Sequence, residues 1–400
     1  MKKIMMIGSA LLVLSSSAFA TEARLLALGM KETDNDGMYY IQDSRNIFLN
    51  PAYVNNYSDI LVTEYGSAGL AVGGKATINK SSSPKAQGGV FKKYGSMVYG
   101  AYLGNESNTS SLLRVAASAT TTPNNFLLQT TDNQLDVFVG GESSVKWGAN
   151  VLYASGKDEV LGSKDSALAT RFGVIGSNWD AHANISLASK SERSTDIAQE
   201  FKGKLGLHVG GSYNVGSGKV FGYYKAYGWD QKLASGSMVK GDFASYYLGY
   251  GTDMTVNGSD KVFASLAARK TDLNIAFTSK AEVRYLIIPV TLGYEAKATE
   301  WLTLRGSVIQ NLYGQRDNKN LVGGSLNTTA QGLVATTYGG NGKATVANST
   351  EVNAGATLNF GQLAIDGLVG TTGTNGAVDS NTGVLSASNL QTKVGLTYKF

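Results

Sequence analysis

The chain has 400 residues, with 35 Lys and Arg against 30 Asp and Glu and a formal net charge of +5. This charge is too small to indicate a nucleic-acid partner, and the absence of Cys excludes disulfides and thiolate chemistry. Glycine is frequent, at 49 residues, whereas charged residues make up only 16% of the chain, against about a quarter in typical soluble domains. Helical apolar periodicity is scarce, so we expect one long β-domain rather than two soluble domains.

Residues 1–20 have the organisation of a secretory signal peptide. Lys2 and Lys3 precede an apolar stretch at residues 4–14, and Ala18-Phe19-Ala20 forms a small-x-small cleavage site. We expect cleavage after Ala20, because the apolar stretch is too short to be retained as a membrane-spanning helix. The next residue is Thr21 rather than Cys, so no lipid anchor is expected there.

Residues 21–58 differ from the rest of the chain. Two short apolar stretches are followed by Asp43 and then by Asn50-Pro51-Ala52. This part resembles the aspartate-to-Asn-Pro-Ala segment of the FadL-type transporters, although the family's Gly/Ala-rich stretch is missing and Tyr53 replaces the usual Gly. The resemblance implies that 21–58 forms a hatch or plug in a barrel lumen. The alternative is a simple turn, which Asn-Pro also favours.

Residues 59–400 form a series of short segments in which apolar and polar side chains alternate. In residues 145–153, for example, Trp147 and Val151 alternate with Lys146 and Asn150. Tight Gly-, Asn- and Ser-rich turns alternate with long polar loops, as in barrels with short periplasmic turns and long extracellular loops. We predict an all-β fold, a transmembrane antiparallel β-barrel of about sixteen strands, with fourteen as the alternative count. A soluble β-sandwich, propeller or solenoid is the rival fold.

The last predicted strand covers residues 390–400. Leu396, Tyr398 and Phe400 fall on one face, and Lys393 and Lys399 fall on the other. This ending resembles the terminal strand of bacterial outer-membrane β-barrels, with Tyr398 and Phe400 as the assembly signal. The resemblance implies an outer-membrane location in a Gram-negative bacterium, surrounded by lipid and lipopolysaccharide, and recognition by the barrel-assembly machinery. The resemblance also implies a homotrimer, because sixteen-stranded porins are usually trimers.

The two faces of each strand predict the two surfaces of the barrel. A charged side chain that faces lipid near the bilayer midplane costs about 2–4 kcal/mol, so the apolar faces must point outward and the polar faces inward. Pro289 interrupts one strand, and we predict a β-bulge at Ile288-Pro289 that resets its faces. The predicted pore-lining residues are Lys146, Arg171, Asp180, His182, Lys204, His208, Lys225, Arg269, Glu282, Arg284, Arg305, Asp366 and Lys393.

No catalytic or metal-binding motif stands out. His182 and His208 are the only histidines, and their spacing matches no zinc motif. Asp180 lies two residues before His182 on the same face, but a polar lumen lining explains this pair better than catalysis does. We therefore expect no cofactor, no metal and no enzymatic activity.

The sequence predicts a porin-like channel for passive diffusion of small hydrophilic solutes. The basic excess on the predicted inner faces suggests a weak anion preference. A FadL-like transporter of hydrophobic compounds is one alternative. A structural or surface-recognition barrel is the other.

Overall fold

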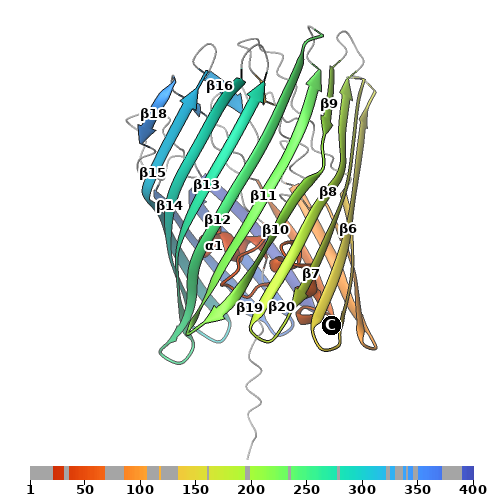
Figure 1. The fold of residues 1–400 in the computed structure, drawn as a ribbon. Helices are drawn as coiled ribbons and strands as arrows, with labels where there is room; N and C mark the ends of the chain where they lie inside the picture. The colour runs from red at the N-terminus through yellow and green to blue at the C-terminus, as the bar shows by residue number, and fades with distance from the viewer. Residues whose placement is uncertain are drawn as a thin grey trace, which may run out of the picture.

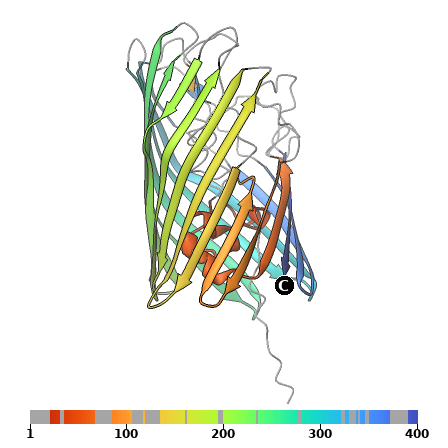
Figure 2. The same ribbon diagram turned by 90° about the vertical axis from the view of Figure 1, so that its right-hand side faces the viewer.

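In the computed structural model, the chain folds as a closed antiparallel β-barrel that surrounds its own N-terminal segment (Figures 1 and 2). The residues that the structure describes are 21–30, 36–67, 85–105, 117–118, 134–159, 162–193, 199–232, 236–276, 280–320, 325–328, 337–338, 341–345, 350–371 and 390–400.

The barrel has sixteen strands, each paired with its neighbours in chain order. They are β1 (Ile60–Ser67), β2 (Lys85–Tyr94), β3 (Met97–Leu103), β5 (Gln134–Glu142), β6 (Lys146–Asp158), β7 (Ser163–Ile175), β8 (Trp179–Arg193), β10 (Gly206–Val215), β11 (Gly218–Lys232), β12 (Met238–Val256), β13 (Asp260–Ala276), β14 (Lys280–Lys297), β15 (Leu302–Lys319), β19 (Thr350–Phe360), β20 (Leu363–Thr371) and β21 (Leu390–Lys399).

Short pieces extend or accompany these strands. β9 (Gln199–Gly203) continues the line of β10 between β8 and β11, and β18 (Gly342–Thr345) continues the line of β19 along β15. β4 (Ala117–Ser118), β16 (Ser325–Thr328) and β17 (Thr337–Tyr338) form a separate small sheet.

The first and last strands close the barrel. β1 pairs antiparallel with β21, from Ile60 opposite Lys399 to Ser67 opposite Thr392. At the end of this seam the Phe400 amide donates a hydrogen bond to the Asp59 carbonyl at 3.1 Å. The predicted antiparallel barrel of about sixteen strands is therefore confirmed, and the count of fourteen is wrong.

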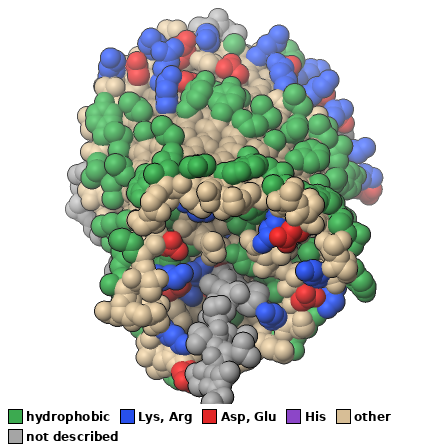
Figure 3. Space-filling model, turned by 60° about the horizontal axis from the view of Figure 1, so that its bottom comes forward, with side chains coloured by type: hydrophobic (Ala, Val, Ile, Leu, Met, Phe, Trp, Pro, Cys, Tyr) green, Lys and Arg blue, Asp and Glu red, His purple; other side chains and the backbone are tan. Residues whose placement is uncertain are grey.

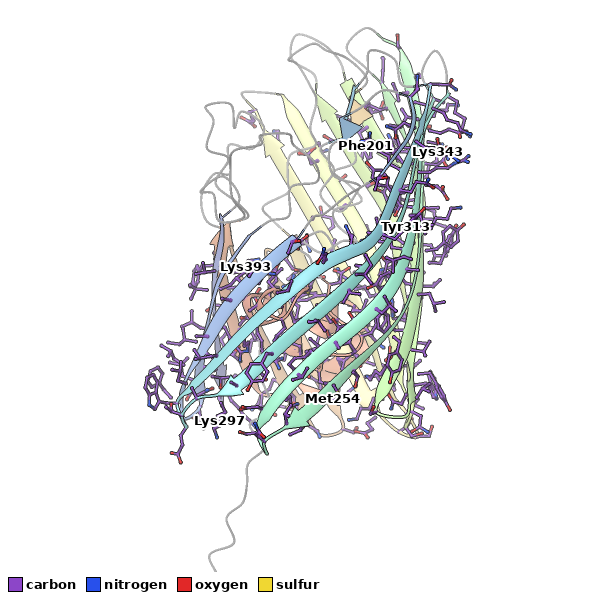
Figure 4. All side chains as sticks on the ribbon, turned by 90° about the vertical axis from the view of Figure 1, so that its left-hand side faces the viewer. Phe201, Met254, Lys297, Tyr313, Lys343 and Lys393 are labelled. Carbon is purple, nitrogen blue, oxygen red and sulfur yellow. The ribbon has the colours of Figure 1, made fainter. Side chains whose placement is uncertain are left out.

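Tight turns gather at one end of the barrel, as glycine placement in the sequence suggests. Gly95 joins β2 to β3 with φ of 59°, and Gly216 joins β10 to β11 with φ of 59°, a conformation that side chains disfavour. Figure 4 places Met254 and Lys297 at this end and Phe201 and Lys343 at the opposite end. Of the two longest loops expected from the sequence, 105–133 lies almost wholly outside the described residues. The other, 314–349, begins later than expected, because residues 314–319 still belong to β15.

The outer surface carries the apolar side chains. On β6, Val151 and Tyr153 are 52% and 54% exposed, whereas the intervening Leu152 is fully buried. Figure 3 shows apolar side chains as a broad band on the face of the wall turned to the viewer, with charged side chains beyond it. An outward apolar band of this kind is suited to contact with lipid. Among the residues described, no helix has the length and hydrophobicity to cross a bilayer.

The irregularity at Pro289 differs from the expectation. The register between β14 and β15 shifts at Ile288/Pro289, but the extra residue is Leu312 on β15, which is 67% exposed. Proline has no N–H to donate, so the partner strand bulges opposite it. β14 itself keeps its alternation, with Val283 buried before Pro289 and Thr291 buried after it. The prediction that the faces of β14 reset is wrong.

The N-terminal segment lies inside the barrel, nearer the tight-turn end (Figure 2). It contains α1 (Glu22–Ala27) and two 3-10 helices, η2 (Ser44–Phe48) and η3 (Pro51–Asn56). The Asp43 carboxylate caps η2 by accepting from the Arg45 amide, and the Asn50 side chain caps η3 by accepting from the Ala52 amide. We call residues 21–30 and 36–57 the plug.

Candidate ligand site in the plugged lumen

The plug contacts the barrel wall all the way round. α1 packs against β15, β19, β20 and β21, and η3 packs against β3, β5, β6 and β7. Asn50 donates to carbonyls of both β7 and β8. Tyr39 stacks on Phe221 of β11 with ring centroids 5.3 Å apart. The plug therefore reaches from wall to wall across the lumen at its level.

Two wall glycines show how close this contact is. A Cβ at Gly148 would collide with the Pro51 carbonyl, and a Cβ at Gly251 would collide with the Tyr40 ring. Both positions face inward, so the absence of a side chain lets the plug backbone and an aromatic ring lie directly against the strands.

One set of buried ion pairs joins α1 to the wall. Arg24 contacts Asp43 at 2.8 Å and Glu295 at 2.9 Å. Arg305 also contacts Glu295 and reaches Asp366 at 3.1 Å. Burial alone would lower the pKa of the Arg24 guanidinium, but Glu295 and Asp43 outweigh burial and raise it. Arg24 is therefore a permanent cation at the centre of this set.

A second set joins the plug to the seam strands. Arg45 contacts Glu64 at 3.3 Å and Glu22 at 3.7 Å, and Lys393 contacts Glu22 at 2.7 Å. The Arg45 guanidinium also lies 4.4 Å from the centre of the Phe48 ring. Burial raises the pKa of the Glu22 carboxyl, but Lys393 and Arg45 outweigh burial and lower it to about 2.

The lowered pKa of Glu22 predicts acid-induced release of the plug. A carboxyl whose pKa falls from 4.5 to about 2 contributes about 3 kcal/mol above pH 4.5, and this contribution is lost as the pH falls toward 2. We expect channel openings in planar bilayers to be more frequent at pH 3 than at pH 5. In the Glu22→Gln variant the frequency should already be raised at pH 5 and should rise less between pH 5 and pH 3 than in the unchanged protein. Equal frequencies at both pH values in the unchanged protein would refute this role of Glu22.

A partly open pocket lies between the plug and the wall, with a cavity volume of about 80 Å³. The surrounding side chains are mostly apolar or aromatic, with a few polar groups among them. Its apolar lining consists of Met30, Met38, Tyr39, Tyr40, Leu49, Phe221, Tyr223, Tyr247, Ile287 and Pro289, and its polar lining includes Asp36, His208, Ser265, Arg269 and Thr291. Apolar walls with a few placed polar groups are typical of small-molecule sites.

Aromatic pairs shape one side of this pocket. The Tyr223 and Tyr247 rings lie 5.0 Å apart, and His208 meets Tyr223 edge-on at 4.9 Å. His182 in turn meets His208 edge-on at 5.0 Å. Stacked and edge-on rings at these separations attract one another and present flat apolar surfaces to a ligand.

A second apolar cluster, buried on the inner side of the wall, lies toward the opposite end of the barrel. Its largest members are Trp229, Phe243, Phe201 and Tyr285, which are buried in one cluster with Leu273, Ile275 and Val283. On the outer face of the same strands, Lys204 pairs with Asp230 at 3.0 Å and Arg284 pairs with Glu282 at 2.8 Å. The polarity of the two faces is therefore inverted in this region.

This inversion corrects three of the predicted positions. Lys204, Glu282 and Arg284 lie on the outer surface, not in the lumen, and the side chains of Lys204 and Arg284 are 52% and 46% exposed. β12 has 19 residues, whereas about 9–11 suffice to cross a bilayer. The excess length projects into water, where charged side chains can face outward without cost. Lys204 also lies in the break between β9, which ends at Gly203, and β10, which begins at Gly206, and the alternation shifts across this break.

The other predicted residues point inward. Arg171 pairs with Asp136 at 2.7 Å, and both side chains are fully buried. Lys146 donates to Asn56 of the plug at 2.6 Å, and Asp180 accepts from Ser212. Arg305, Asp366 and Lys393 belong to the ion pairs around α1, whereas His208 and Arg269 line the pocket and Lys225 and His182 are buried nearby.

The sequence analysis did not identify two of the wall residues that form ion pairs with the plug. Glu64 on β1 and Glu295 on β14 were not among the predicted pore-lining residues, although Glu64 stands between Thr63 and Tyr65 on the face shared with Val62. That alternation could have identified Glu64 as inward-facing. Across the described residues, no group of three or more His, Cys, Asp or Glu side chains is arranged to hold a metal ion.

No protein-family model matches the chain, and no curated protein matches it. Among solved structures, it is similar to the toluene transporter TodX of P. putida, with 14% identity, a TM-score of 0.37, and coverage of 94% of this chain and 99% of that one. It is also similar to an anion-selective porin from Comamonas acidovorans, with 13% identity, a TM-score of 0.34, and coverage of 86% and 97%. At these TM-scores neither likeness bears on what this chain does.

Proposed function

We propose that this protein is an outer-membrane channel for small apolar molecules, and that aromatic compounds are its preferred ligands. The observation that carries the proposal is the pocket between plug and wall, lined mainly by Tyr39, Tyr40, Phe221, Tyr223 and Tyr247. Flat rings bury large apolar areas against such side chains. The outward apolar band supports a location in a membrane. The predicted signal peptide supports export of this chain.

The inner wall is also apolar beyond the pocket, toward the far end of the barrel. Trp229, Phe243 and Tyr285 are packed into one buried cluster there, so this part of the inner wall is apolar rather than lined by hydrated polar groups. A general diffusion pore instead needs a hydrated path through the lumen, and the plug occupies the lumen at its level. This geometry favours the transporter of hydrophobic compounds over the hydrophilic porin that the sequence first suggested.

A binding measurement tests the proposed function. We expect the purified protein to bind a fluorescent naphthylamine and to be competed by naphthalene but not by glucose. Ile287 lines the pocket, and Ile287→Asn should weaken binding about tenfold because about 1.4 kcal/mol of apolar contact is lost. The readout is fluorescence titration in detergent.

A matched substitution on the next strand serves as the control. Ile309 also faces inward and is 1% exposed, but it does not line the pocket. Ile309→Asn should leave the affinity within about twofold of the unchanged protein, provided that the barrel remains heat-modifiable. Equal losses in both variants, or no binding by the unchanged protein, would contradict the proposed function.

A further inference from the structure

Thr21 occupies a position that is built into the barrel wall. Its side chain is 1% exposed, and its hydroxyl donates to Asp366 Oδ2 at 3.1 Å. Asp366 on β20 is paired in register with Gly395 on β21, and a Cβ at Gly395 would collide with Thr21. An acceptor on one strand and a missing side chain on the next therefore form a seat for this residue.

The ion pairs at this seat contain one carboxylate too many. Arg24 bridges Asp43 and Glu295, and Arg305 bridges Glu295 and Asp366. Two guanidinium groups thus serve three carboxylates, and the side chains of Asp43 and Asp366 are both 0% exposed. A buried carboxylate without a full ionic partner is strongly unfavourable, so this seat must either take up a proton or gain one more cation.

The neighbouring ion pairs do not supply it. In the second set, Glu22 and Glu64 are already matched by Arg45 and Lys393. The surplus also affects Asp43, because burial raises the pKa of its carboxyl to about 7 against the effect of Arg24, and the charge of Asp366 adds to the rise. The deficit of positive charge therefore lies in the set that contains Asp366.

We propose that cleavage of the Ala20–Thr21 peptide bond supplies the missing cation, as the α-ammonium group of Thr21 paired with Asp366. Water adds its hydroxyl to the Ala20 carbonyl carbon and a hydrogen to the Thr21 nitrogen as the C–N bond breaks. The new amine then takes up a proton, because its ordinary pKa is about 7.7–8.0 and adjacent carboxylates raise it. The three carboxylates are then balanced by three cations.

This inference gives the cleavage site a second role besides export. Thr21 is buried in the folded barrel, so a peptidase has access to the bond only before the plug is seated. A chain that keeps residues 1–20 would carry an amide, without charge, beside Asp366. Processing therefore becomes a condition for locking the plug, whatever ligand the pocket takes.

The test compares two forms of the chain that begin at Thr21. One form has a free α-amine and the other is N-acetylated, which removes the charge and leaves every side chain unchanged. After both are refolded in detergent, we expect peptides from residues 22–30 to exchange deuterium about tenfold faster in the acetylated form. Equal exchange rates would overturn the proposal.

The Asp366→Asn variant shows whether the charge of Asp366 is responsible. Without the surplus carboxylate, free and acetylated chains should exchange within about twofold of each other. A difference as large as that of the unchanged protein would overturn the pairing with Asp366.

A second measurement does not depend on that variant. The α-amine, dimethylated with carbon-13 so that its charge is kept, should titrate by NMR well above the ordinary pKa of about 7.7–8.0. An ordinary value would place the amine away from the carboxylates and overturn the proposal.

Discussion

Deleting residues 22–57 is expected to raise the single-channel conductance at least about tenfold, because a sixteen-stranded barrel without a plug encloses a water-filled lumen. The deletion removes the side chains that reach the walls from every direction, including Arg24, Tyr39 and Asn50. The carboxylates that remain on the wall, such as Glu64 and Asp366, would then be hydrated by lumen water. The measurement is current through the purified protein in planar bilayers, compared with the full chain.

A reversible crosslink provides the control for this deletion. A Cβ on Gly355 would lie 2.7 Å from the Ala27 Cβ, and the chain has no other Cys, so Ala27→Cys with Gly355→Cys can form a disulfide after a small shift. The oxidised double variant should stay closed in planar bilayers. Reduction of its disulfide should restore the channel openings of the full chain. If the deletion leaves the conductance unchanged, the plug does not close the lumen.

Reversal potentials across the opened barrel would also measure the weak anion preference predicted from the sequence.

Replacing Arg24 by Ala is expected to weaken plug seating by about 3–5 kcal/mol, because Asp43 and Glu295 lose their shared partner while they remain buried. The Arg24 side chain is only 3% exposed, so water cannot replace it without displacing α1. The measurement is the urea concentration at which protease cuts the plug while the barrel remains heat-modifiable. We expect a clear decrease for Arg24→Ala.

The outer surface offers the matched control. Arg284 pairs with Glu282 at 2.8 Å, a distance like that of Arg24 and Asp43, but its side chain is 46% exposed. Exposed pairs contribute about 0–1 kcal/mol, so Arg284→Ala should leave the urea midpoint nearly unchanged. Similar midpoints for the two variants would show that the plug is not held by the buried pairs.

The sequence was sufficient to predict the barrel, because a strand that faces lipid outside and polar groups inside has a period of two. Val151 and Tyr153 on the outside and Asn150 on the inside follow this rule. The rule failed for Glu282 and Arg284 because alternation does not reveal where the bilayer ends. Beyond the lipid the outer face meets water, and the same alternation then places charges outside and apolar groups inside.

The site could be predicted only in part. Residues such as Arg305 and Asp366 were expected to face inward, but their partners could not be deduced. Arg24 and Glu295 are 271 positions apart in the chain, and only the docked plug brings them into contact. The aromatic pocket was missed for the same reason, since Tyr39 and Phe221 belong to segments with no local relation. No pattern along one strand reports a contact of that kind.

The short connection between plug and wall has a kinetic consequence. η3 ends at Asn56 and β1 begins at Ile60, so only residues 57–59 join them. A released plug would remain beside its binding surface at an effective concentration of about millimolar or more, and re-docking would be an intramolecular step. Opening would then be brief and frequent rather than permanent. Each opening would end when the plug re-docks, so no permanently open pore would remain in the membrane.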